Sequence, residues 1–65
     1  MLNLFIARRA KKLTQKELAK KVGTSNIQIS RIENGVASPR ADLLKRIALE
    51  LEVSMEFLMQ EAGKE

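Results

Sequence analysis

The sequence predicts an all-α fold, in which a single domain of residues 1–65 is built from five short helices. Apolar residues recur at helical spacing in five segments, and serine, threonine and glycine stand where helices would begin or end. No segment alternates apolar and polar residues as a half-buried strand would. The predicted helices cover residues 2–11, 15–22, 26–33, 40–51 and 55–61.

The first two helices are predicted by apolar spacing and by a cap. Leu4 and Ala7 share one face of the first helix, with Arg8 beside them. Thr14 and Glu17 form a capping box at the start of the second helix. The threonine hydroxyl can accept from the Glu17 N–H while the Glu17 carboxylate reaches back.

The third helix follows a short turn. Gly23 can take the positive φ that ends the second helix, and Ser25 can cap the third. Ile29 and Ile32 give the third helix its apolar stripe, and Gly35 can end it.

The fourth helix has the strongest apolar stripe, formed by Leu43, Leu44, Ile47, Ala48 and Leu51. Its start has two interpretations. Either Ser38 is the N-cap and Pro39 the first helical residue, or the two residues form a turn just before the helix. Ser54 can cap the fifth helix.

The composition argues against an enzyme. The 65 residues include no Cys and no His, which removes thiol nucleophiles, the usual metal ligands and the commonest general base. The three glycines are scattered and cannot form a phosphate-binding loop. We therefore expect no catalytic residues, no metal and no cofactor.

Charge is distributed unevenly along the chain. Residues 1–40 hold nine Lys and Arg against two acids, a net +7, whereas residues 41–65 hold three against six, a net −3. The basic first part favours a polyanionic partner on one face, although a solvated helix surface would carry the same run of charge.

The N-terminal apolar run is only seven residues long and precedes Arg8 and Arg9, the reverse of a signal peptide. No segment approaches the roughly 20 apolar residues of a membrane span. We expect a cytoplasmic protein that makes no contact with a membrane.

The segment QKELAKKVGTSNIQISRIEN, residues 15–34, is the most informative part of the chain. Two predicted helices are separated there by the short turn at residues 23–25, so they should cross steeply. The small Ala19 fits a close approach of the two helices. The pattern is typical of a helix-turn-helix.

The chain resembles the DNA-binding domain of lambdoid phage repressors and Cro, and of the related bacterial regulators of the xenobiotic-response-element family. The resemblance covers about residues 2–60 and includes LTQKELA from Leu13, VGTS from Val22 and ISRIENG from Ile29. It implies a regulator of transcription, most often a repressor, that binds double-stranded DNA as a dimer. Two departures are Lys12, where the family often has glycine, and Arg40, where a serine or threonine cap is common.

In a helix-turn-helix, the N-terminal part of the second helix contacts base edges in the major groove. The corresponding residues are Asn26, Ile27, Gln28, Ser30 and Arg31. Arg31 fits guanine and an amide such as Asn26 fits adenine, whereas Ile27 suits a thymine methyl group. The alternative for Ile27 is incidental exposure, which is common for single apolar residues.

Phosphate contacts position such a domain on the duplex. The candidate residues are Gln15, Lys16, Arg9, Asn34 and Arg40, of which Gln15 and the backbone at Asn34 follow from the resemblance. The resemblance also implies a partly buried ion pair between Arg8 and Glu33, which would make Arg8 mainly structural.

Several apolar residues lie outside the main stripes: Leu2, Phe5, Ile6, Leu49, Met55 and Met59. They either form a partner surface or thicken a small core. The resemblance implies a homodimer that pairs through the C-terminal region. A second hypothesis is a module whose main partner is a protein, such as an antitoxin with autoregulatory DNA binding. A third is a bridging helical domain that has lost base reading.

Overall fold

The computed structural model describes residues 1–60, and within that range it contains five helices and no strand. The helices are α1 (Leu2–Ala10), α2 (Gln15–Val22), α3 (Asn26–Glu33), α4 (Ala41–Leu51) and α5 (Met55–Met59). The predicted all-α class is therefore confirmed, and the bounds of α2 and α3 agree with those expected from the sequence.

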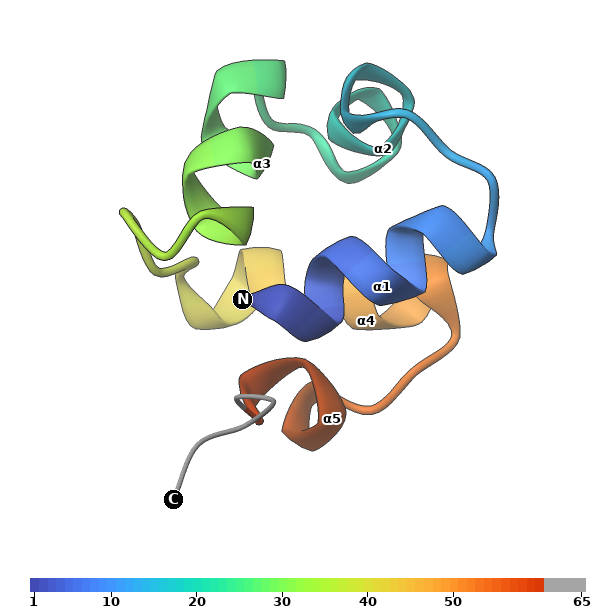
Figure 1. Ribbon diagram of the computed structural model, residues 1–65, viewed down its shortest axis with the longest axis vertical. Coiled ribbons are helices and arrows are strands. Elements are labelled where there is room, and N and C mark those ends of the chain that lie inside the picture. Colours follow the sequence, from blue (N-terminus) through green and yellow to red (C-terminus); the bar gives the residue numbers. More distant parts are fainter. Residues whose placement is uncertain (61–65) are drawn as a thin grey trace.

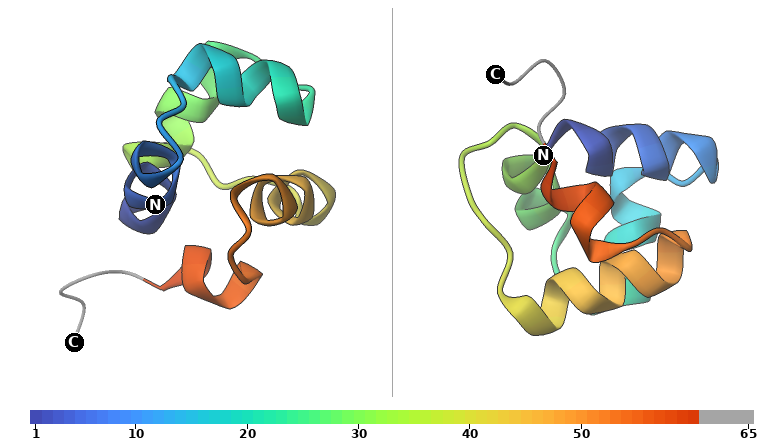
Figure 2. Two further views of the ribbon diagram at one scale, coloured as in Figure 1. Left: turned by 90° about the vertical axis from the view of Figure 1, so that its right-hand side faces the viewer. Right: turned by 90° about the horizontal axis from the view of Figure 1, so that it is seen from below.

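The helices are arranged in three levels. α2 and α3 pack against each other at one end of the molecule, α5 lies at the opposite end, and α1 and α4 lie between them (Figures 1 and 2). α5 contacts both α1 and α4, whereas α2 contacts α4 and α3 contacts α1. The helix-turn-helix is thus supported from below by the two central helices.

One apolar core joins all five helices. It contains the stripe residues expected from the sequence, and Ala19, which the short turn between α2 and α3 requires to be small, is buried among them. The core residues are Leu4, Ala7, Leu18, Ala19, Val22, Ile29, Ile32, Leu43, Leu44, Ile47, Ala48, Leu51 and Leu58.

The predicted caps form as expected. Thr14 Oγ1 accepts from the Glu17 N–H at 3.0 Å, and the Thr14 N–H donates to Glu17 Oε1 at 2.9 Å, which completes the capping box. Ser25 and Ser54 cap α3 and α5 by accepting from the N–H groups of Gln28 and Phe57, without the reciprocal bond of a capping box. Gly23 ends α2 with a φ of 78°, in the left-handed region that favours glycine.

Three helix ends differ from the predictions. α1 ends at Ala10, one residue early, because Lys12 takes a left-handed φ of 60°. α4 begins at Ala41, since Arg40 has an extended backbone, so Pro39 lies in the irregular segment before the helix and is not its first residue. α5 ends at Met59, because Gln60 is extended; the expected last residue, at position 61, lies outside the described residues.

The apolar residues outside the main stripes do not form extra core. Five of them are exposed: Leu2, Phe5, Ile6, Leu49 and Met59. Only Met55 packs against the core, as expected if these residues enlarged a small core. Asn3 is also buried, which the sequence did not predict. Its side-chain amide donates to the carbonyl oxygens of Phe57 and Gln60, and these bonds tie α1 to the end of α5.

Candidate nucleic-acid interface

A buried polar network joins the first three helices. Arg8 Nε donates to Glu33 Oε2 at 2.6 Å, and Arg8 Nη2 donates to Glu33 Oε1 at 3.2 Å. The two side chains are only 7% and 5% exposed. The structure therefore brings the two residues of the expected ion pair into contact, in the bidentate geometry that guanidinium and carboxylate groups favour.

The same network extends to the start of α2. Gln15 Nε2 donates to Glu33 Oε1 at 2.9 Å, and Arg8 Nη1 donates to the Leu13 carbonyl oxygen at 2.7 Å. Within residues 1–60, no buried side-chain nitrogen or oxygen lacks a partner. Glu33 thus links the C-terminal end of α3 to both α1 and the first residue of α2.

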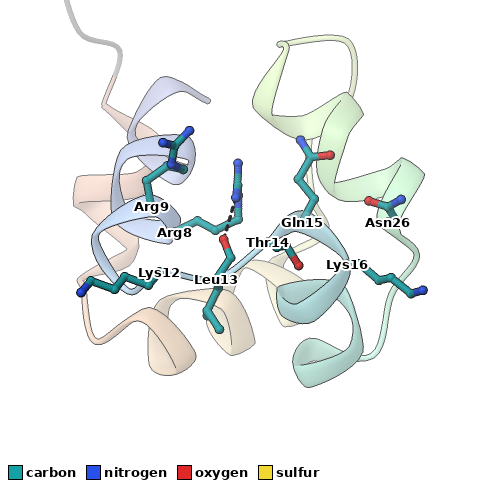
Figure 3. A pocket seen from close by; sticks show the side chains of 8 residues that line it. All are labelled: Arg8, Arg9, Lys12, Leu13, Thr14, Gln15, Lys16 and Asn26. Atoms are coloured by element: carbon teal, nitrogen blue, oxygen red, sulfur yellow. Dashed lines mark hydrogen bonds between the residues drawn. The ribbon is translucent and has the colours of Figure 1, made fainter.

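A basic groove lies between α1 and α2, and we call it the α1–α2 groove. It is lined by Arg8, Arg9, Lys12, Leu13, Thr14, Gln15, Lys16 and Asn26. Figure 3 shows Arg8, Arg9 and Gln15 extending in the same direction from the two helices, with Lys12 and Lys16 on opposite sides. The guanidinium groups of Arg8 and Arg9 each lie 5.5 Å from the ring centre of Phe5, within cation–π range.

A second groove, the turn–α4 groove, lies between the helix-turn-helix turn and the start of α4. It is lined by Gly23, Thr24, Ser25, Gln28, Ser38, Arg40, Asp42, Leu43 and Arg46. Two of these residues are arginines, and Arg46 has the Asp42 carboxylate 3.8 Å away. The first turn of α3 contributes to both grooves, through Asn26 on one side and Gln28 on the other.

The outer face of α3 carries the remaining residues expected to contact bases. Ile27 is 66% exposed and Arg31, one turn further on, is also exposed. Ser30 is half-buried and its hydroxyl accepts from Asn34 Nδ2 at 3.5 Å. Asn34 is exposed at the C-cap of α3, next to Glu33 and at the other end of the helix from Asn26.

The structure adds groove residues that sequence reasoning did not select. Lys12 lines the α1–α2 groove, and Ser38 and Arg46 line the turn–α4 groove. The sequence offered only their polarity or charge as a signal. Each groove also includes residues of α3 or of the turn before it, which lie apart in sequence from the cations of that groove, so spacing within one helix cannot reveal the groove. The hydrogen bond from Gln15 to Glu33 was missed for the same reason.

The described residues show neither a metal-binding cluster nor a membrane-spanning helix. Among residues 1–60, no group of three acidic side chains gathers closely enough to hold a metal ion. None of the described helices combines the length and the apolar character that a membrane crossing requires.

The fold and its two-helix motif define a class of protein, and comparison with known families agrees. The profile of the helix-turn-helix family matches residues 4–58, so this chain belongs to the Cro- and repressor-like helix-turn-helix family. No solved structure gives a significant match.

Two relatives illustrate the family. The chain is 41% identical over 51 residues to a Mycobacterium tuberculosis protein named as an uncharacterized HTH-type transcriptional regulator, Rv0474. It is 46% identical over 57 residues to RghRB of Bacillus subtilis, which carries the same description. These matches cover 78% and 86% of this chain but only 36% and 41% of the relatives. The chain thus spans about two fifths of the length of these relatives.

Proposed function

We propose that this chain is a sequence-specific regulator of transcription that binds double-stranded DNA, and that it represses from a palindromic operator as a homodimer without a cofactor. The observation that carries this proposal is the position of the first turn of α3. Asn26 and Gln28 line two grooves that bear cations, while Ile27 between them is exposed. An exposed helix end flanked by positive charge is suited to the major groove, which two phosphate backbones enclose.

The grooves supply the phosphate contacts in this proposal. Arg9, Lys12 and Lys16 in the α1–α2 groove face one backbone, and Arg40 and Arg46 in the turn–α4 groove face the other. Each neutralised phosphate releases counterions, so affinity should fall steeply as salt rises. Asn34, at the C-terminal end of α3, contacts the DNA backbone although it does not line either groove.

The exposed face of α3 supplies the base contacts. Arg31 donates two hydrogen bonds to guanine O6 and N7, and Ile27 contacts a thymine methyl group. Asn26 or Gln28 pairs with adenine N6 and N7, and Ser30 can donate to a neighbouring base edge. The names of the relatives, which describe regulators of transcription, support the regulatory part of the proposal.

The dimer contact is proposed for the C-terminal region, where Met59 on α5 is 58% exposed. Two-fold pairing would present two copies of α3 to successive half-sites about one helical turn apart. A second function, binding a protein partner as an antitoxin does, is favoured by a different observation. Leu2, Phe5 and Ile6 form an exposed apolar stripe on α1, which single scattered residues would not make.

The test is selection of binding sites from a randomised duplex pool at moderate salt. The unaltered protein should recover a palindromic motif, and Arg31→Ala should blur it at one base pair in each half-site, a loss of about 1–3 kcal/mol of discrimination. Lys45→Ala is the matched control, because it removes one exposed charge from α4 and should leave the motif intact.

Each part of the proposal can fail separately. A motif with a single half-site would contradict the dimer. If no motif emerges and binding disappears as salt rises, the basic face is nonspecific, and the function moves to a protein partner.

A further inference from the structure

We propose that Glu33 is a positioning residue for DNA binding, because its buried carboxylate fixes the Gln15 amide so that the amide nitrogen donates to a DNA phosphate in the α1–α2 groove. This inference rests on the proposed function, since it names the phosphate-contacting group of the same interface. It gives Glu33 a part in binding beyond its ion pair with Arg8.

The chemistry of the two side chains determines which end of the amide faces which partner. Glu33 Oε1 accepts from Gln15 Nε2 at 2.9 Å. An ionised carboxylate can only accept, so it selects the nitrogen end of the amide and rejects the oxygen end. The amide nitrogen has two hydrogens, and the second remains for another acceptor. Figure 3 shows the Gln15 nitrogen on the side of Arg8 and the oxygen on the side of Asn26.

A carboxylate beside a phosphate site would normally repel the phosphate. Arg8 removes this objection, because two of its nitrogens bond the Glu33 carboxylate and make the pair neutral overall. A third bond, from Arg8 to the Leu13 carbonyl oxygen, fixes the guanidinium group in turn. Glu33 can therefore orient Gln15 without adding net negative charge to the groove.

Rigidity is the advantage of this arrangement. The Glu33 side chain is 5% exposed and bonded through both oxygens, whereas Gln15 is half-buried at the first position of α2. A glutamine that is already held loses less side-chain freedom when it meets a phosphate, so more of the hydrogen-bond energy remains as affinity.

The test is a double-mutant cycle with Glu33→Gln and Gln15→Ala, measured with a labelled mixed-sequence duplex. Phosphate contacts do not depend on sequence, so this probe reports them without a known operator. Gln15→Ala should weaken binding about tenfold, as expected for one hydrogen bond to a charged group. Glu33→Gln should weaken it by a similar factor, and the double variant should bind no more weakly than Gln15→Ala alone.

The matched control is Gln60→Ala, which removes a glutamine side chain from beyond the end of α5 and should leave affinity unchanged. If the losses of DNA affinity caused by Glu33→Gln and by Gln15→Ala simply add, Glu33 has only a structural role and the inference is wrong. Unchanged DNA affinity in Gln15→Ala would also overturn it. A wild-type protein that does not bind the duplex would overturn the proposed function as well, which is a different result.

Because Glu33→Gln also weakens the buried ion pair, a second measurement uses the unaltered protein. In NMR spectra, one side-chain amide proton of Gln15 should exchange slowly with water, and the other should shift when the mixed-sequence duplex is added. Two Gln15 amide protons that exchange equally fast, or that do not shift with the duplex, would overturn the inference without any variant.

Discussion

Two ion pairs tie the end of α1 to later helices, and their environments differ sharply. Arg8 meets Glu33 at 2.6 Å with side chains 7% and 5% exposed. Lys11 meets Glu52 at 2.7 Å with side chains 39% and 74% exposed. The distances are nearly equal, so the difference between the pairs lies in what surrounds them.

The surroundings determine what each pair contributes. The buried pair has lost its water, and the Leu13 carbonyl oxygen and Gln15 replace it. Removing one partner would leave the other charge without compensation in the interior. In the exposed pair, water and salt can replace either partner at little cost. Contact distance alone therefore says little about stability in this protein.

The largest effect is expected from Arg8→Ala. It leaves the Glu33 carboxylate buried without its cation, and it should lower the free energy of unfolding by about 3–5 kcal/mol. For a domain of this size, such a loss could remove most of the folded population. Denaturant unfolding followed by circular dichroism measures it.

Arg9→Ala is the control for that experiment. Arg9 is the same residue type one position along α1, but it is exposed. Its substitution should change unfolding by less than about 1 kcal/mol. If Arg8→Ala and Arg9→Ala lowered the free energy of unfolding equally, burial would not determine how much each arginine stabilises the fold.

A gain in stability is expected from Lys12→Gly, at the residue next to the exposed pair. Lys12 has a φ of 60°, a conformation that costs a residue with a Cβ about 1–2 kcal/mol and costs glycine little. The melting temperature should rise by about 4–8 °C for each 1 kcal/mol gained, as measured by calorimetry.

Lys12→Gly should also weaken binding to the mixed-sequence duplex, because Lys12 lines the α1–α2 groove.

The control for the stability measurement is Lys20→Gly. Lys20 lies inside α2, where glycine should lower the free energy of unfolding by about 1 kcal/mol. If both glycine variants were destabilising, the left-handed backbone at Lys12 would not be a source of strain.

The smallest effect is expected from Lys11→Gln, which removes the cation of the exposed pair. The free energy of unfolding should change little at neutral pH, because solvent screens an exposed ion pair. The hydrogen bond and charge of Lys11 lower the pKa of Glu52 below its ordinary value of 4.5. Because the pKa of Glu52 is lower in the folded protein, the ion pair adds stability at pH values above the ordinary pKa. This added stability is lost as the pH falls through the pKa of the folded protein.

An NMR titration of the Glu52 carboxyl group measures this directly. In Lys11→Gln, the pKa of Glu52 should return toward 4.5. A Glu52 pKa that is the same in both proteins would show that the contact does not persist in solution.

The helix-turn-helix was predictable because its signals are local. Thr14, Ser25 and Gly23 act on backbone groups within four residues of themselves, and Ile29 and Ile32 mark one face of a single helix. Helix ends were harder to predict, because Lys12 and Arg40 differ from the residues that usually stand at such positions. Lys12 adopts a left-handed backbone that glycine would favour, and Arg40 stands at the N-cap of α4 without a side-chain cap.

The sequence by itself determined the all-α class, the order of the helices and which face of each helix is buried, because spacing and caps depend on neighbours along the chain. Apart from the pair of Arg8 and Glu33, which the family resemblance implied, only the tertiary structure decided which charges meet. Arg8 and Glu33, Lys11 and Glu52, and the two sides of the turn–α4 groove come from segments far apart in sequence. Helix packing alone brings such groups within hydrogen-bond range, and burial then decides which of the contacts stabilise the fold and which remain open to a partner.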